Sequence, residues 1–127
     1  MNKKQYVGRL GEKAAARYYF FHGALVKKRN FRAGKHEIDI IAESARYLIF
    51  SEVKTRTQDP DSPSAFGVPS AAVTKDKQRC LLQAVRGYLS LHPTKKRIRL
   101  DVVEVYVSSD EKPKVLKVVC MPDAFHA

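Results

Sequence analysis

Hydrophobic side chains recur every three or four residues in two stretches of the chain, which predicts two amphipathic helices. The first stretch covers residues 4–22 and is followed by Gly23, where a C-terminal cap belongs. The second begins within residues 69–74 and ends near Leu91, ahead of Pro93. The inward positions are Val7, Leu10, Ala14, Tyr18 and Phe21 in the first helix and Leu81, Leu82, Val85 and Leu89 in the second.

Five other stretches have the short apolar runs that are typical of strands. They cover residues 24–31, 37–42, 47–54, 97–107 and 114–121. Apolar residues on both faces of the third indicate a central strand. Residues 57–70 hold three prolines and one glycine and predict a surface loop. The order α-β-β-β-α-β-β is that of an α/β fold with a mixed central sheet flanked by helices, and we expect one domain over residues 1–127.

The net charge of the chain limits the classes of partner to expect. Its 24 Lys and Arg residues against 13 Asp and Glu give a net charge of +11, which indicates nucleic acid or an anionic membrane surface as a partner, or simply a basic protein. Residues 1–23 carry charges where a signal peptide needs an apolar core, and no run is long enough to span a bilayer. We therefore expect a cytoplasmic protein without a membrane partner. Cys80 and Cys120, which are far apart and have no His or Cys neighbours at metal-ligand spacing, predict reduced, buried thiols.

Charged residues stand in the second and third strands, which otherwise have the pattern of a buried hairpin. Burying unpaired charges is costly, so such residues usually bind something. With a four-residue loop at 43–46, Asp39 would face Phe50 and Glu37 would face Glu52. Because side chains alternate with a period of two, the charged side chains of these strands would then lie on one face of the sheet: Glu37, Asp39, Glu52 and Lys54. Opposed carboxylates destabilise a sheet unless a cation lies between them.

Magnesium, or manganese in its place, is the ion that this set of residues favours. Mg²⁺ takes oxygen ligands and is commonly held by one or two carboxylates with water and substrate phosphate. Asp39 and Glu52 would supply carboxylates and Val53 its backbone carbonyl, while the absence of Cys and His from the set argues against zinc. Lys54 could orient or deprotonate an attacking water or stabilise charge at phosphorus. In the alternative interpretation, Lys54 only neutralises Glu52 and Asp39 caps a strand end.

Asp39, followed after twelve residues by Glu52-Val53-Lys54, resembles the motif of the PD-(D/E)xK nuclease superfamily. Ile38 stands where the motif's name has proline, a residue that the superfamily does not require. The predicted element order also matches the superfamily's restriction-endonuclease-like core. The chain further resembles the bacterial YraN-like (UPF0102) family, which is related to archaeal Holliday-junction resolvases. The stretches that carry this resemblance are GEKAAARYY, HEIDII, FSEVKTR, FGVPSAAVTKDKQRCL and RLDVVEV.

The resemblance implies a metal-dependent endonuclease that hydrolyses phosphodiester bonds in branched or structured DNA, with a role in repair or recombination. One or two Mg²⁺ ions would activate a water for in-line attack, leaving a 5′-phosphate and a 3′-hydroxyl. Because junction resolvases act as dimers, a homodimer is one assembly that the resemblance allows.

The resemblance also implies further site residues. Glu12 matches a glutamate that joins the metal site from the first helix, and Gly8 and Ala16, one turn away on either side, would let that helix lie close to the sheet. A polar residue of the second helix, Lys77 or more specifically Gln78, would support the ligands, as would Glu37. Taken without the resemblance, Glu12 has the pattern of a solvated helix residue, and Gln78 that of an exposed first-turn residue.

Cationic residues grouped around the mouth of the site would bind the phosphate backbone, with strong salt dependence and little sequence discrimination. We expect recognition of nucleic-acid structure rather than of bases, and the loop 57–70 would either fold over the substrate or serve as a connector. The predicted contacts are Lys27, Lys28, Arg29, Arg32, Arg56, Lys75, Lys77, Arg79, Lys95, Lys96 and Arg97. Two alternatives remain: a non-catalytic nucleic-acid-binding module with the nuclease fold, and a basic RNA- or ribosome-associated protein, which leaves the acidic residues unexplained.

Overall fold

The computed structural model describes residues 1–58 and 74–125. The predicted order of helices and strands is confirmed. Strand β3 extends further than expected, so that of the predicted loop only residues 59–70 remain, and these lie outside the described residues. The elements are α1 (Lys3–Phe21), β1 (Leu25–Ala33), β2 (His36–Glu43), β3 (Tyr47–Gln58), α2 (Lys75–Leu91), β4 (Arg97–Ser108) and β5 (Val115–Met121).

Side-chain caps set where both helices begin. The side chain of Asn2 accepts the N–H of Gln5, whose side chain accepts the N–H of Asn2, which is a capping box. Thr74 accepts the N–H of Lys77, and α2 starts at the next residue after this cap. Gly23 follows α1 with a φ of 81°, a conformation that costs glycine nothing. Neither helix in the described part of the chain is long and apolar enough to cross a bilayer.

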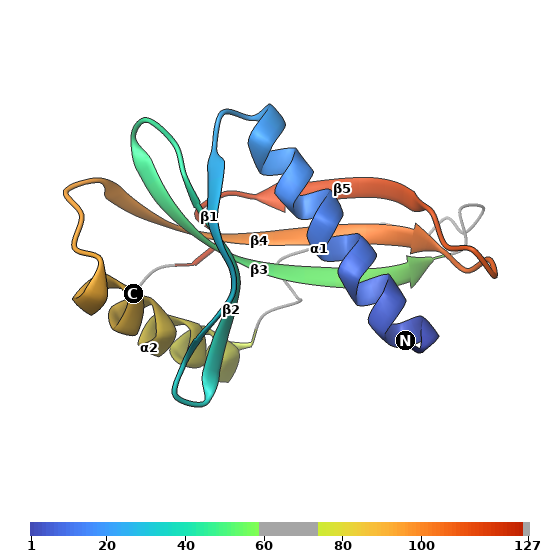
Figure 1. Cartoon of the computed structure of the whole chain (residues 1–127), viewed down its shortest axis with the longest axis horizontal. Helices are drawn as coiled ribbons and strands as arrows, with labels where there is room; N and C mark the ends of the chain where they lie inside the picture. The colour runs from blue at the N-terminus through green and yellow to red at the C-terminus, as the bar shows by residue number, and fades with distance from the viewer. Residues whose placement is uncertain (59–73, 126–127) are drawn as a thin grey trace.

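The five strands form one mixed sheet in the order β1-β2-β3-β4-β5. Neighbouring strands are antiparallel except β3 and β4, which are parallel and are connected through α2. Figure 1 shows β1 and β2 running steeply across the direction of β3, β4 and β5. The pairing of β2 with β3 stops at Ile40 and Ser51, so the two strands fork beyond this pair.

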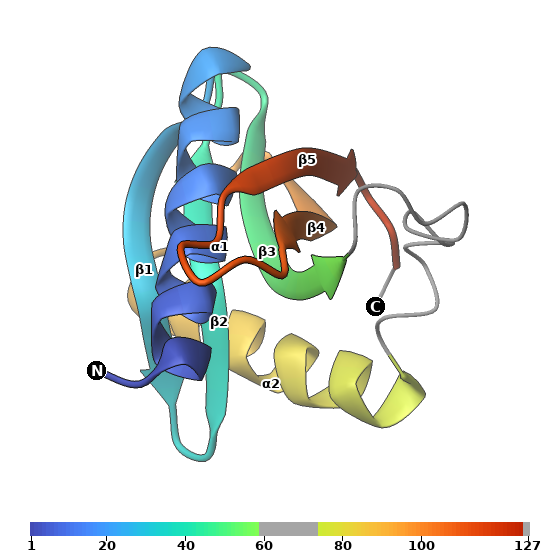
Figure 2. The same ribbon diagram turned by 90° about the vertical axis from the view of Figure 1, so that its right-hand side faces the viewer.

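The helices cover opposite faces of the sheet, each with its own hydrophobic core (Figure 2). Leu81 and Val85 of α2 pack on one face, and Ala15 and Tyr19 of α1 pack on the other. The sheet residues of the α2 core include Ile38, Ile41, Leu48, Phe50, Leu100 and Val102, and those of the α1 core include Ile40, Ala42, Ile49, Val103, Val105 and Val107.

Strand β2 rotates at the fork. Ile38 and Ile41 both pack on the α2 side, whereas Ile40 packs on the α1 side. Regular alternation would put Ile38 and Ile40 on the same face. The alternation therefore breaks at Asp39, which lies between them.

The turn between β2 and β3 is tighter than the four-residue loop that the sequence suggested. The Ser44 N–H donates to the Tyr47 carbonyl at 2.9 Å, and the Tyr47 N–H donates to the Ser44 hydroxyl at 3.1 Å. Ala42 consequently pairs with Ile49 rather than with Tyr47. The predicted register was therefore wrong by two residues. Because the pleat has a period of two, this shift keeps the paired residues 40–43 on their expected faces, but beyond the fork the rotation at Asp39 breaks the predicted alternation.

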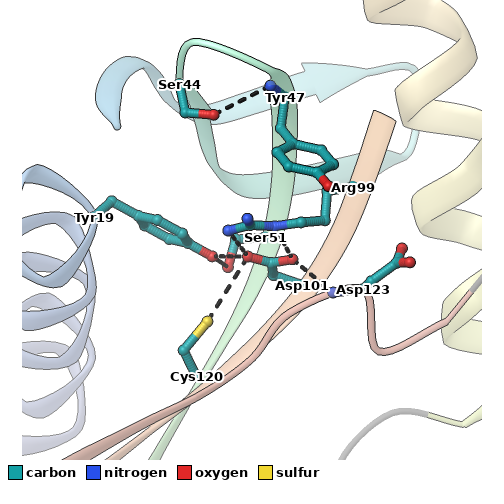
Figure 3. A network of polar contacts seen from close by, with 8 residues as sticks. All are labelled: Tyr19, Ser44, Tyr47, Ser51, Arg99, Asp101, Cys120 and Asp123. Carbon is teal, nitrogen blue, oxygen red and sulfur yellow. Dashed lines mark hydrogen bonds and ion pairs between the residues drawn. The ribbon is translucent and has the colours of Figure 1, made fainter. Parts of the chain in front are cut away.

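A buried polar network ties α1 to the sheet (Figure 3). Its centre is Asp101 on β4, which is fully buried. Arg99 donates to both carboxylate oxygens at 3.0 Å, and the Tyr19 hydroxyl donates at 2.8 Å. The backbone N–H of Asp123 and the Cys120 thiol complete the set at 2.9 and 3.7 Å. Both oxygens of a buried charge thus have partners, the condition under which such a charge is tolerated.

Helix α1 approaches β3 most closely at Gly11. A Cβ atom at this position would lie 1.8 Å from Thr55 Oγ1. The sequence had assigned the close approach to Gly8 and Ala16, but a Cβ at Gly8 would meet nothing within 4 Å. The contact therefore lies directly beside Glu12, not one turn away.

Gly11→Ala is expected to destabilise the protein by about 1–3 kcal/mol through overpacking against Thr55, although alanine is the better helix former by about 1 kcal/mol. Urea unfolding measures the change. Gly8→Ala is the matched control and should stabilise, and adding Thr55→Ala to Gly11→Ala should recover part of the loss. Equal stabilisation by both glycine substitutions would contradict the close approach.

Candidate active site

Asp39 lies at the fork between β2 and β3. Its Oδ2 accepts the N–H of Val53 at 2.8 Å, so this side chain replaces the backbone partner that β2 no longer supplies. Continued past its last pair, Ile40 with Ser51, the observed register would bring Asp39 opposite Glu52 and not opposite Phe50 as predicted. Because β2 rotates here, the two carboxyl groups meet at the edge of β3 rather than on one face of a flat hairpin.

The pKa of Asp39 is raised at this contact. Burial, followed by repulsion from Glu52, raises the pKa of Asp39 from 3.8 to about 7, and the hydrogen bond from Val53 opposes the shift. Glu52 is itself only 6% exposed. Asp39 therefore keeps its proton to a higher pH than an ordinary aspartate does.

Glu12 reaches the same place from α1. Together with Asp39, Val53 and Thr55 it lines a cavity of about 600 Å³. Burial and repulsion from Asp39 raise the pKa of Glu12, while a hydrogen bond with Asn30 opposes the shift. The structure thus brings the carboxylate of α1 beside that of β2.

Asn30 is a site residue that the sequence did not indicate. It falls between the pairs Arg29–Ile40 and Phe31–Ile38, opposite Asp39. Its φ of 53° is left-handed, a conformation that asparagine adopts more readily than most residues. The one available signal was an asparagine inside a strand, where this residue is depleted.

The other predicted site residues, Lys54, Gln78 and Glu37, differ in exposure and in their partners. Lys54 is exposed and follows Glu52 on the same side of β3. Within the described ranges Glu52 is ion-paired not by Lys54 but by Lys77 of α2, at 3.7 Å. Gln78 is half-buried, and Glu37 pairs with Arg32 at 3.3 Å.

The cations fall into groups at different ends of the sheet. Arg97 pairs with Tyr47, seven residues before Lys54 and thus about 23 Å from it along β3, and Lys96 is bound to Glu43 at 3.0 Å. The grouping of residues 95–97 around the site was therefore wrong. Lys3 and Lys4, which no motif in the sequence indicated, line the cavity with Glu12 and Asp39. The exposed cations of β1 and α2 are Lys27, Lys28, Arg29, Arg32, Lys75, Lys77, Arg79 and Arg86, of which the sequence had indicated all but Arg86.

The donors at the fork fit a hard divalent cation. All are oxygens, and the Val53 carbonyl faces the same edge as its N–H because both groups of a strand residue point to one neighbour. In the residues that the structure describes, no three Asp, Glu, His or Cys side chains form a metal-ligand group by themselves. Mg²⁺ does not need one, since it is commonly held by one or two carboxylates with water and phosphate.

The sequence of this chain is similar to those of one protein family. Residues 11–105, which include every residue of the acidic contact, match the model described as "Uncharacterised protein family UPF0102". A UPF0102 protein of Caldicellulosiruptor bescii is 37% identical over 127 residues, covering 98% of this chain and 100% of that protein. A UPF0102 protein of Chlorobaculum tepidum is 38% identical over 118 residues, covering 92% and 88%. One of Desulfosudis oleivorans is 40% identical over 106 residues, covering 83% and 82%.

Proposed function

This chain belongs to the protein family UPF0102, and we propose that it is a metal-dependent endonuclease acting on phosphodiester bonds in branched or structured DNA. The contact between Asp39 and Glu52 at the fork carries the proposal. A divalent cation between the two carboxyl groups would relieve the repulsion by Glu52 that helps to raise the pKa of Asp39. The Asp-x₁₂-Glu-x-Lys spacing, which resembles that of the PD-(D/E)xK nucleases, supports the same reaction.

Each residue at the fork has a distinct part in the proposed reaction. A Mg²⁺ or Mn²⁺ ion held by Asp39, Glu52 and the Val53 carbonyl, with Glu12 nearby, would lower the pKa of a water and neutralise phosphate charge. The Val53 N–H holds one oxygen of Asp39 and leaves Oδ1 for binding. Lys54, exposed beside Glu52, offers its ammonium group to the attacking water or to the charge that grows on the phosphate oxygens.

The charge of the protein supports the proposed substrate class. The net charge of +11 suits a polyanion, and the exposed cations of β1 and α2 lie on the two elements that flank the fork. Such contacts read the phosphate backbone and not the bases. Recognition of a branched or otherwise structured duplex is therefore favoured over recognition of a sequence.

Two measurements test the proposal. Mg²⁺ is titrated calorimetrically, and cleavage is measured on a four-way junction, a linear duplex and single-stranded DNA of the same sequence. We expect wild type to bind Mg²⁺ and to cut the junction, and Asp39→Asn to lose both activities. Asp110→Asn, the same change at an exposed acid of the β4–β5 turn, should lose neither.

The two readouts separate the parts of the proposal. Absence of both Mg²⁺ and Mn²⁺ binding would contradict the metal site. Metal and DNA binding without cleavage of any of these DNAs would contradict the reaction and favour the non-catalytic nucleic-acid-binding module.

Metal affinity is expected to depend on pH near neutrality. Since the pKa of Asp39 is raised to about 7 and the ion needs the ionised carboxylate, binding below that pH must displace a proton. Apparent affinity should then rise up to about tenfold per pH unit below the pKa and level off above it. Calorimetry in buffers of different ionisation enthalpy counts the protons released. An affinity independent of pH between about 6 and 8 would contradict the raised pKa.

The same pKa fixes the sign of a stability effect. A carboxyl whose folded-state pKa lies above its ordinary 3.8 binds its proton more tightly in the folded state. Metal-free protein should therefore lose stability as pH rises from about 4 to about 7. Asp39→Asn, a neutral isostere, should remove this loss and unfold at a higher temperature than wild type above pH 7.

A further inference from the structure

Glu104 on β4 is a buried carboxylate that the proposed reaction does not use. Its side chain is 1% exposed. Oε2 accepts the Tyr106 hydroxyl and contacts Arg56 Nε at 3.2 Å, while Oε1 is buried and has no hydrogen-bond partner within the described structure. A buried charge is strongly destabilising once its ionic partner is removed. The guanidinium of Arg56 is therefore held firmly against β4.

The pairing of β3 with β4 places this ion pair next to the acidic site. Glu104 lies beside Lys54, and Tyr106 lies beside Arg56. Arg56 follows Glu52 and Lys54 on the same side of β3, about 7 Å beyond Lys54. An arginine on this line would meet the backbone of any nucleic acid whose phosphate reaches Lys54.

The geometry of the ion pair leaves Arg56 able to bind. Its side chain is 42% exposed, and its contact with Glu104 is made through Nε. The two terminal amino groups make no ion pair with the residues that the structure describes. A guanidinium presents its N–H donors in a rigid fork that matches phosphate oxygens, which an ammonium group does not.

We propose that Glu104 is a positioning residue that holds the Arg56 guanidinium beside Lys54 as a receptor for a backbone phosphate of bound nucleic acid. The inference rests on the nucleic-acid-binding part of the proposed function and not on cleavage. Glu104 itself does not contact the ligand. Tyr106 remains a hydrogen-bond donor to Glu104, because burial and the neighbouring carboxylate raise the pKa of Tyr106 to about 12.

The effect of Glu104→Gln on DNA binding differs in sign according to whether Glu104 acts by positioning Arg56 or only through its charge. If its charge alone mattered, removing a carboxylate from a protein of net charge +11 would strengthen DNA binding. If Glu104 positions Arg56, removing the carboxylate frees a flexible side chain whose ordering then opposes binding. Glu104→Gln should therefore weaken binding despite the more positive charge.

The test is fluorescence anisotropy of a labelled four-way junction in EDTA, repeated over a range of NaCl concentrations. Arg56→Ala should weaken binding about fivefold to tenfold and lower the salt slope by about 1. Arg56→Lys, which keeps the charge but not the fork, should lose nearly as much. Glu104→Gln should bind about twofold to fivefold more weakly, and should have no further effect when combined with Arg56→Ala. Glu111→Gln makes the same charge change in the exposed β4–β5 turn and should bind at least as tightly as wild type.

Three results would overturn the proposal: Glu104→Gln binding as tightly as Glu111→Gln, Glu104→Gln weakening the Arg56→Ala variant further, or Arg56→Lys matching wild type. Arg56→Lys lies at an exposed position and keeps a positive charge beside Glu104, so the last result does not depend on the folding of a core variant. Circular dichroism checks the fold of Glu104→Gln and of Arg56→Ala, which leaves the buried Glu104 without its ionic partner. Since EDTA prevents metal-dependent cleavage, failure of the nuclease reaction itself would appear only in the cleavage assay.

Discussion

Lys54→Ala is expected to slow DNA cleavage by about 10²- to 10⁴-fold while leaving Mg²⁺ affinity unchanged. The side chain is exposed, and the ion pair to Glu52 within the described residues comes from Lys77. Removal of Lys54 should therefore disturb neither the fold nor the acidic contact. The loss should appear in the chemical step, where the ammonium group would orient the water or stabilise charge on the phosphate.

Single-turnover cleavage at saturating protein isolates that step from DNA binding. Lys112→Ala, in the exposed β4–β5 turn, removes the same charge far from Lys54 along the chain and should cut at the wild-type rate. A Lys54→Ala variant that cuts as fast as Lys112→Ala would remove Lys54 from the mechanism. Loss of Mg²⁺ binding in Lys54→Ala would show a role in the metal site rather than in the reaction.

Asp101→Ala is expected to lower the free energy of unfolding by about 3–5 kcal/mol, the largest stability effect that the structure suggests. The substitution removes the acceptor of Arg99, Tyr19 and the Asp123 backbone together (Figure 3). It leaves those donors unsatisfied in the interior. Because the Tyr19 hydroxyl also lies 2.9 Å from the Ser51 hydroxyl, the loss should loosen α1 from β3 as well as from β4.

Urea unfolding followed by circular dichroism measures this effect. Asp101→Asn, which keeps the shape but loses the charge, should fall between wild type and Asp101→Ala. Asp110→Ala, at an exposed turn position, should change stability by no more than about 0.5 kcal/mol. An Asp101→Ala variant within about 1 kcal/mol of wild type would show that the network adds little to stability.

The features that could be predicted from the sequence are those with local causes. Periodicity and caps determine the helices, and the α-β-β-β-α-β-β order follows from short apolar runs between turn residues. The sequence also predicts that Glu52 and Lys54 lie on the same side of the sheet, because side chains alternate along a single strand whatever its partners are. The association with UPF0102, inferred from short stretches of sequence, is confirmed by the family match.

The features that could not be predicted depend on tertiary geometry. The register of the β2–β3 hairpin depended on whether Ser44 caps a tight turn or belongs to a longer loop, and the residues suit both. The rotation of β2 at Asp39 accompanies the end of its pairing with β3 at Ile40 and Ser51, which no local pattern in the sequence marks. No sequence pattern predicted the left-handed backbone of Asn30, or the burial of Glu104 in an ion pair with Arg56.

The central claim is that Asp39 and Glu52, meeting at the fork, hold a divalent cation. Paramagnetic broadening by substoichiometric Mn²⁺ in isotope-labelled protein locates the ion directly, because the effect falls steeply with distance. The amide signals of Asp39 and Val53 should broaden first, with Glu12 next, and Asp39→Asn should abolish the effect. Broadening that begins instead at exposed acids such as Asp110 and Glu111, or that is uniform along the chain, would contradict the metal site.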